Sequence, residues 1–266
     1  MYPYPLFGVI DLYWIFIIVG VLGAFLFLRI FSSKLNIPAK VFNFLLLNGI
    51  LTVVVGYLFA ILFQDFYHLI DTGEWSWNAG ATFYGGLIGG TLFFILFYLF
   101  GGKLFFKDNS HISYFPLVVN CVLTVVALGH AFGRIGCLMD GCCYGQVTDS
   151  WIGIHMYFDP DGVKRIPTQL LESLFLFMLF GVLTYFLVKR KNEYIASIYM
   201  ISYGIWRFTI EYFRGDAERG SLGSSYLWPS QIIAIVLVIA GIGLIFLYKF
   251  FLRNFFLKFD NNEKEN

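Results

Sequence analysis

Three charged residues in this sequence lie at helical spacing near the end of a long apolar run. Glu211 and Arg214 follow Arg207 at offsets of four and seven residues, so one helix face carries all three. An ionisable group inside a membrane span costs about 2.5–3.5 kcal/mol on insertion scales. Glu211 can neutralise one arginine and leave the other positive. The alternative is a plain ion cluster whose side chains reach out of the membrane to water.

A second candidate site is the glycine-rich segment 133–145, whose sequence is GRIGCLMDGCCYG. Glycines allow tight turns and a close approach of the backbone to a ligand. Arg134 directly follows an apolar run, and an arginine beside free backbone N–H groups makes a good phosphate receptor. The alternative is a glycine-rich re-entrant turn with an arginine that reaches to the membrane surface.

Two further segments place polar side chains at the start of apolar runs. Pro167 and Thr168 are typical of a helix start, with Thr168 as a capping residue. Gln169 and Glu172 then fall in the first turns, where Glu172 could simply be solvated. Gln231 follows Pro229 by two residues and occupies the matching place in the last apolar run.

Tyr84 precedes a glycine pattern near the start of the third apolar run. Gly86 and Gly90 form a GxxxG face, which favours close packing of two helices. The Tyr84 hydroxyl either faces a polar cavity or belongs to an ordinary interfacial aromatic belt.

Histidines and cysteines offer other chemistry. A base could come from His68, His130 or His155, although a lone histidine is more often structural. His130 lies one helical turn before Arg134. The thiols of segment 137–143 lack the spacing of a standard zinc site, so we expect packing or a local disulfide and no metal. The cysteines of this stretch are Cys137, Cys142 and Cys143.

The elements that carry these residues are predicted to be membrane helices. Apolar residues make up 59% of the chain and charged residues 13%, against usual shares of about 45–50% and about 25%. Lipid cannot satisfy a bare backbone, so each apolar run is expected to be a helix. The net charge of +1 does not favour nucleic acid. The predicted spans are Leu12–Phe31, Val41–Phe63, Gly80–Phe100, Tyr114–Phe132, Gln169–Val188, Tyr194–Phe213 and Ser230–Phe251.

The distribution of Lys and Arg predicts the orientation. Most of the 18 basic residues fall on one side, which the positive-inside rule makes cytoplasmic. We therefore expect an all-α protein of seven transmembrane helices, with the N-terminus outside and the C-terminus inside. Residues 1–266 would form one integral membrane domain, 133–168 a small extracytoplasmic head within it, and 260–266 a disordered tail.

This topology gathers the polar residues at the outer leaflet. Interfacial polar residues without a function would be expected at both faces. A one-sided group with excess arginine predicts an anionic ligand that enters from the outer leaflet, and a phospholipid is the plainest candidate. The group comprises Tyr84, Arg134, Gln169, Glu172, Arg207, Glu211, Arg214 and Gln231.

The same residues resemble motifs of the prolipoprotein diacylglyceryl transferases, which are integral membrane enzymes of bacteria. Segment 133–145 is similar to the family signature around an essential arginine, Arg134. Segment 167–172 resembles its Pro-x-Gln-Leu-x-Glu segment, and segment 203–214 a second arginine motif. Two positions depart from the family pattern: Tyr84 stands where histidine is usual, and Cys137 where asparagine is usual. They raise the prospect of a homologue with an altered acceptor or reduced activity.

The resemblance implies transfer of the diacylglyceryl group of phosphatidylglycerol to the lipobox cysteine of a prolipoprotein signal peptide, at the bacterial plasma membrane. It implies a thioether and glycerol phosphate as products, with no cofactor. Arg134, Arg207 and Tyr84 are the expected catalytic residues. The expected substrate-binding residues are Gly133, Arg134, Asp140, Gly145, Gln169, Glu172, Glu211 and Arg214.

Two other classes of function stay open from the residues alone. A lipid or solute transporter also buries charges, but it would need polar residues through the full membrane thickness, and the inner halves of the spans are nearly bare. A membrane thiol oxidoreductase would use Cys137, Cys142 and Cys143, and would need a reactive pair with a depressed pKa.

Overall fold

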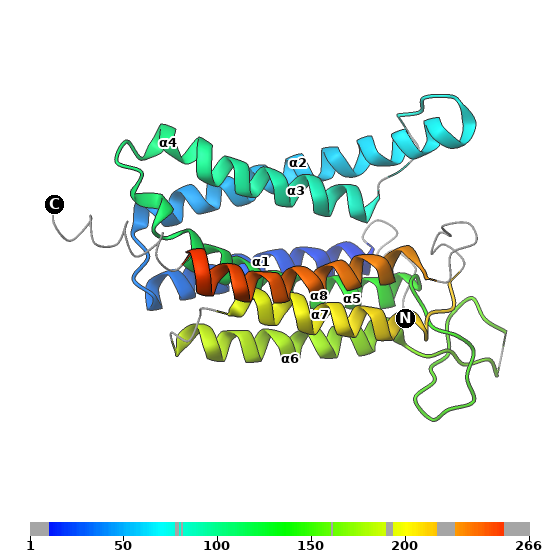
Figure 1. The fold of residues 1–266 in the computed structure, drawn as a ribbon. Coiled ribbons are helices and arrows are strands. Elements are labelled where there is room, and N and C mark those ends of the chain that lie inside the picture. The colour runs from blue at the N-terminus through cyan, green and yellow to red at the C-terminus, as the bar shows by residue number, and fades with distance from the viewer. Residues whose placement is uncertain are drawn as a thin grey trace. The chain divides into compact units, whose positions relative to one another are not determined.

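In the computed structural model, the regular secondary structure of the described residues is helical, and a long loop joins α5 to α6 (Figure 1). Those residues contain three isolated β-bridges and no strand. The chain divides into two compact units, Met1–Leu35 with Val119–Asn254, and Asn36–Val118 with Phe255–Asn266. The described residues are 11–77, 80, 82–160, 162–189, 194–216 and 227–252.

The first unit is a bundle of long helices that carries most of the predicted site. The α6 helix contacts α5 where the Ser173 hydroxyl donates a 2.9 Å hydrogen bond to the Ala131 carbonyl. Glycine allows α7 and α8 to pack closely, because a Cβ on Gly204 would lie 2.8 Å from the Ala234 carbonyl oxygen. The helices of the bundle are α1 (Leu12–Lys34), most of α5 (Phe115–Asp140), α6 (Thr168–Val188), α7 (Ile195–Glu211) and α8 (Pro229–Leu247), which continues into a π-helical turn, Tyr248–Leu252.

The second unit is built on two packed helices. A Cβ on Gly86 would lie 3.3 Å from the Gly56 carbonyl oxygen, which confirms the prediction that the GxxxG face serves close packing. Gly73, in the left-handed conformation, ends the longer helix. The elements are α2 (Ala39–Thr72), α3 (Phe83–Leu96), a π-helical turn (Phe97–Gly101), α4 (Gly102–Phe105) and a 3-10 turn (Ser110–Ile112).

Six of the described helical segments are long and apolar enough to cross a membrane. They confirm the predicted all-α class and indicate a multi-pass membrane protein. The α7 helix has 17 residues, which is short against the roughly 20 that a bilayer requires. The seventh span and the N-out orientation therefore stay predictions. The tail 260–266 lies outside the described residues.

The fourth predicted span ends later than expected. The α5 helix continues from Phe132 to Asp140, so Gly133, Arg134 and Gly136 are helical. The expectation that their backbone N–H groups are free to bind a ligand is wrong, because a helix uses these groups internally. Gly136 permits helix packing instead, since a Cβ there would lie 3.2 Å from the Tyr13 carbonyl oxygen of α1.

Candidate active site

The polar residues of the first unit lie at one end of its bundle. The α5 and α7 helices end where α6 and α8 begin (Figure 1). The loop between α5 and α6, residues 141–167, lies beside these helix ends and is called the head loop below. Because consecutive helices run antiparallel, the C-terminal turns of α5 and α7 lie at the same end of the bundle as the N-terminal turns of α6 and α8. The arrangement positions the two arginine motifs and the segment 167–172 for contact.

Glu172 of α6 connects three helices. Its Oε2 atom lies 2.9 Å from Arg134 Nε of α5, and its Oε1 atom accepts a 3.0 Å hydrogen bond from the Tyr203 hydroxyl of α7. Glu172 is only 2% exposed, so the alternative that it is solvated is wrong. A carboxylate withdrawn from water needs such partners. Arg207 is close enough to act on this carboxylate electrostatically, but its own ion pair is with Glu211.

A second ion cluster is local to α7 and the residues after it. Arg207 Nη2 lies 2.9 Å from Glu211 Oε2, and Arg214 Nη1 lies 3.7 Å from the same oxygen. Arg214 also pairs with Asp216, to which its Nε donates a 2.9 Å hydrogen bond. Burial opposes the charge of Arg214, but Asp216 raises the pKa of this guanidinium above its ordinary value. The sequence predicted that Glu211 would neutralise one of the two arginines and leave the other positive. Asp216 instead pairs with Arg214, so each arginine has a carboxylate partner.

Buried hydrogen-bond donors without partners lie on α7 and α8. Arg207 is 9% exposed, and its Nη1 has no hydrogen-bond partner among the described residues. The same holds for Nε2 of Gln231, whose Oε1 accepts a 3.1 Å hydrogen bond from the Trp228 N–H at the start of α8. An unsatisfied buried donor costs about 1–3 kcal/mol. Acceptor oxygens of a ligand would satisfy these groups.

The start of α6 holds the head loop. Gln169 Nε2 donates a 2.5 Å hydrogen bond to the Cys142 carbonyl, and the Thr168 hydroxyl donates one of 2.8 Å to the Cys143 carbonyl. The prediction that Thr168 caps α6 is therefore wrong. Pro167 is the N-cap residue, and it makes no side-chain hydrogen bond to the helix. The two side chains fix the loop to the bundle beside Arg134.

Gly145 makes a close backbone approach to neighbouring protein segments, and its predicted substrate binding stays a prediction. Its N–H donates a 2.9 Å hydrogen bond to the Ile166 carbonyl. A Cβ on Gly145 would lie 2.4 Å from that oxygen and 2.9 Å from the Phe213 carbonyl oxygen. The neighbouring Gly215 N–H donates to the Tyr144 carbonyl at 3.0 Å. Glycine is thus required where the head loop crosses the segment after α7.

The other predicted site residues have different surroundings. Asp140 is exposed at the end of α5, and no ion pair involves it among the described residues. Gly133 lies in mid-helix, where a Cβ would make an ordinary 3.7 Å contact with Ile17. Tyr84 lies in α3 of the second unit, and its side chain is outside the described residues. Substrate binding by Gly133 and Asp140 stays a prediction.

The three candidate bases differ in environment. His130 Nε2 lies 4.0 Å from Glu172 Oε1, and its ring packs edge-on against Tyr203 with 5.3 Å between ring centroids. His155, in the head loop, accepts a 3.0 Å hydrogen bond from the Gly162 N–H. In the second unit, His68 Nδ1 is within hydrogen-bond distance of the Glu74 carbonyl oxygen and the Thr72 hydroxyl. Within the first unit, His130 is the histidine placed beside the arginines.

Sequence reasoning left Tyr203 and Asp216 out of the site. Tyr203, Arg207 and Glu211 recur at intervals of four, so the helical spacing that paired Arg207 with Glu211 could also have found Tyr203. Asp216 is an acid two residues after Arg214. Its pairing depends on a turn that residue spacing alone does not predict.

A family model of the prolipoprotein diacylglyceryl transferases matches residues 6–247. The chain belongs to this family. It is similar to the phosphatidylglycerol–prolipoprotein diacylglyceryl transferase of Clostridium tetani (strain Massachusetts / E88), with 35% identity over 247 residues, which cover 90% of this chain and 94% of the relative.

Two other relatives of the same description extend this likeness. The phosphatidylglycerol–prolipoprotein diacylglyceryl transferase 2 of Clostridium perfringens (strain 13 / Type A) is 37% identical over 187 residues, 69% of this chain and 64% of the relative. That of Hydrogenovibrio crunogenus (strain DSM 25203 / XCL-2) is 32% identical over 216 residues, covering 77% of each chain. The similarity of this chain to the prolipoprotein diacylglyceryl transferases thus extends well beyond the motifs that contain Arg134 and Arg207.

In this member of the transferase family, three thiols form a cluster where the last turn of α5 meets the head loop. The Sγ atoms of Cys137, Cys142 and Cys143 lie within 4.8 Å of one another, and all three cysteines are free. Hydrogen bonds with Cys137 and Cys142, and then the charges of Arg134 and Arg214, lower the pKa of the Cys143 thiol, whereas hydrogen bonds with Cys137 and Cys143 and burial raise the pKa of the Cys142 thiol. The cluster therefore adjoins the arginines and can hold negative charge.

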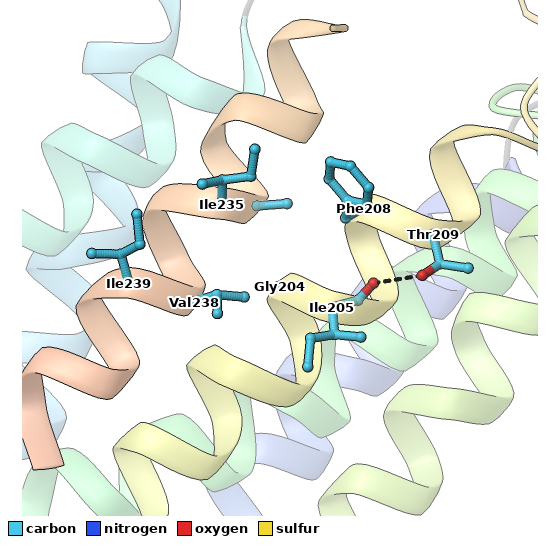
Figure 2. A pocket seen from close by; sticks show the side chains of 8 residues that line it. Gly204, Ile205, Phe208, Thr209, Ile235, Val238 and Ile239 are labelled. Carbon is cyan, nitrogen blue, oxygen red and sulfur yellow. Dashed lines mark hydrogen bonds between the residues drawn. The ribbon is translucent and has the colours of Figure 1, made fainter.

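An apolar groove of about 270 Å³ runs between α7 and α8 (Figure 2). Gly204 leaves its floor open, and the Thr209 hydroxyl turns away to its own helix, where it donates a 2.9 Å hydrogen bond to the Ile205 carbonyl. Arg207 belongs to the same stretch of α7. The groove is therefore suited to a hydrocarbon chain, although Arg207 itself does not line it. Its lining residues are Gly204, Ile205, Phe208, Thr209, Ala234, Ile235, Val238 and Ile239.

Proposed function

We propose that this protein transfers the diacylglyceryl group of phosphatidylglycerol to the lipobox cysteine of prolipoproteins. The observation that carries the proposal is the pair of buried arginines at this end of the bundle, Arg134 on Glu172 and Arg207 on Glu211, in a chain that belongs to the transferase family over most of its length. Arginines held in place before the substrate arrives can stabilise a departing phosphate without reorganisation.

The reaction is a displacement at the glyceryl carbon next to the phosphate. The acceptor attacks as a thiolate, a carbon–sulfur bond forms, and the carbon–oxygen bond to phosphate breaks. The electron pair leaves with glycerol phosphate, and the thiol proton passes to a base or to solvent. Arg134 and Arg207 bind the phosphate and offset its growing charge. His130, which lies 4.0 Å from Glu172 in the same unit, assists the thiol.

The buried donors and the apolar groove fit the two halves of such a lipid. Arg207 Nη1 and Gln231 Nε2 offer hydrogen bonds to phosphate or glycerol oxygens. The groove between α7 and α8 offers room for part of an acyl chain. The proposal places the protein in the bacterial plasma membrane with seven spans, α7 included, and with the site open to the outer leaflet, where a prolipoprotein signal peptide would meet it.

The decisive assay uses the purified full-length protein, phosphatidylglycerol labelled in its acyl chains, and a lipobox peptide. Label should appear on the peptide cysteine. Arg134→Ala and Arg207→Ala should each lower the transfer rate by about 10²–10³-fold, the loss typical of a removed electrostatic stabiliser. Arg29→Ala, which changes an arginine exposed on α1, is the matched control. Unchanged transfer in both site variants would refute the proposed site, and no transfer by the unaltered protein would refute the function.

A further inference from the structure

We propose that Cys137, Cys142 and Cys143 form a binding site for one thiophilic metal cation, with zinc as the representative ion. The Sγ atoms of the three residues lie within 4.8 Å of one another at the head-loop end of the bundle. Spacing in the sequence did not predict this, because C-x4-C-C is not a standard ligand pattern. The structure brings the thiols together through a turn of the backbone.

That turn begins where α5 ends. Gly141 adopts the left-handed conformation, with φ of 82°, and its N–H donates a 3.0 Å hydrogen bond to the Cys137 carbonyl. The N–H of Cys142 donates to the same carbonyl at 3.2 Å. This end to a helix folds the next residues back over its last turn. Cys143 also has a positive φ, of 60°, so the backbone directs both thiols toward Cys137.

The spacing of the sulfurs fits a shared ion. Zinc–thiolate bonds of about 2.3 Å place the sulfurs of a tetrahedral site about 3.8 Å apart. Sulfurs already within 4.8 Å of one another need to close by no more than about 1 Å. No fourth His, Cys, Asp or Glu joins the group in the described part of the chain, so water or an added ligand would complete the coordination. Sulfur ligands select thiophilic ions over magnesium or calcium.

The surrounding charges favour a thiolate at Cys143. Arg134 and Arg214 both act electrostatically on Cys143. Three thiolates with one divalent ion carry a net charge of −1, which is smaller than the charge of the three thiolates alone. The arginines are themselves paired with Glu172 and Asp216, so they do not present a large unbalanced positive charge to an approaching cation.

A bound ion would fix the head loop to the bundle. The carbonyls of Cys142 and Cys143 already accept hydrogen bonds from Gln169 and Thr168. Adding metal–sulfur bonds at the same two residues would fasten the loop through both its backbone and its side chains. The site therefore predicts thermal stabilisation of the folded protein by metal, since a ligand of the native state raises its apparent stability.

Cadmium is the probe, because its thiolate bonds absorb in the ultraviolet. The reduced, chelator-treated full-length protein in detergent is titrated with CdCl2, followed by absorption and by metal analysis after desalting. One cadmium per chain, with thiolate absorption, is expected. Cys137→Ser, Cys142→Ser and Cys143→Ser should each weaken binding by at least about 100-fold, since loss of even an outer-shell partner costs 10–100-fold. Cys121→Ser, which changes a buried cysteine of α5 outside the cluster, should bind as before.

A measurement on the unaltered protein avoids variants that fail to fold. Zinc should protect Cys137, Cys142 and Cys143 together from maleimide labelling, as read by peptide mass spectrometry. No cadmium absorption, equal binding by the three serine variants, or unprotected thiols would overturn the proposal. So would oxidation by glutathione disulfide that links two of the thiols in a protein unable to bind cadmium, because the cluster would then be a redox pair. None of these readouts depends on diacylglyceryl transfer.

Discussion

The two compact units remove titratable groups from water in different ways. In the first, Glu172, Arg207 and Glu211 are buried as charged groups that meet opposite charges. In the second, His111 is buried among aromatic rings, with Phe106 and Tyr98 at 5.0 Å and 5.7 Å between centroids. Ion pairs hold charge in place and keep it available to a substrate, whereas an aromatic cage favours the neutral form of a base. The buried charges beside the predicted arginine site are thus held by ion pairs, whereas the buried imidazole of His111 is held by packing.

The largest expected effect comes from breaking the interhelical ion pair. Glu172→Ala leaves Arg134 largely buried without its carboxylate, and breaking such a pair typically costs about 3–5 kcal/mol. We expect a correspondingly lower unfolding free energy in detergent and loss of transfer. Glu74→Ala, at an exposed acid, is the control.

A double substitution sharpens this test. Arg134→Met with Glu172→Leu removes both charges, and apolar replacement of a buried pair is often neutral for stability. The double variant should recover much of the stability lost in Glu172→Ala and still transfer no lipid. A Glu172→Ala variant as stable as the unaltered protein would show that the pair does not hold the helices together.

Two glycines of the signature segment should respond in opposite directions. Gly145→Ala forces a Cβ within 2.4 Å of the Ile166 carbonyl oxygen, and overpacking of this kind typically costs about 1–3 kcal/mol. Gly133→Ala makes only a 3.7 Å contact in mid-helix, where alanine is better than glycine by about 0.5–1 kcal/mol. Thermal unfolding of both variants measures the difference. If Gly133→Ala is stable but inactive, Gly133 contacts substrate as predicted.

The smallest effect concerns acid stability through His111. Burial lowers the pKa of this imidazole below its ordinary value, so the unfolded chain binds more protons once the pH falls below about 6.5. Stability is therefore complete above that pH and declines below it, by at most about 1.4 kcal/mol per pH unit. His111→Gln should flatten the decline in unfolding free energy between pH 7 and pH 5. His155→Gln, at an exposed histidine, is the control; an unchanged slope in His111→Gln would contradict the account.

Much of the helical architecture was predictable from apolar run length, since lipid leaves the backbone few alternatives. The ion pair of Arg207 with Glu211 was also predictable from the sequence, because it depends on helix periodicity alone. The pairing of Arg134 with Glu172 joins residues 38 positions apart on different helices. Residue spacing holds no information about that contact.

Two local predictions were wrong: the conformation of the glycines in segment 133–145 and the role of Thr168 as a helix cap. Four glycines in segment 133–145 suggested a loop, but Gly133 and Gly136 are helical, and of the four only Gly141 has a positive φ. Thr168 has the composition of a cap, yet a tertiary acceptor, the Cys143 carbonyl, takes its hydroxyl. For Thr168, a contact from elsewhere in the fold overrode a local preference.

The most direct test of the central claim is a double-mutant cycle on transfer rate with Arg134→Ala, Arg207→Ala and the double variant. If both guanidiniums stabilise one departing phosphate, their effects should be coupled by at least about 1 kcal/mol, with the double variant much less impaired than the product of the single losses. Strictly additive losses would mean that the two arginines act independently, and unimpaired transfer in either single variant would contradict the account.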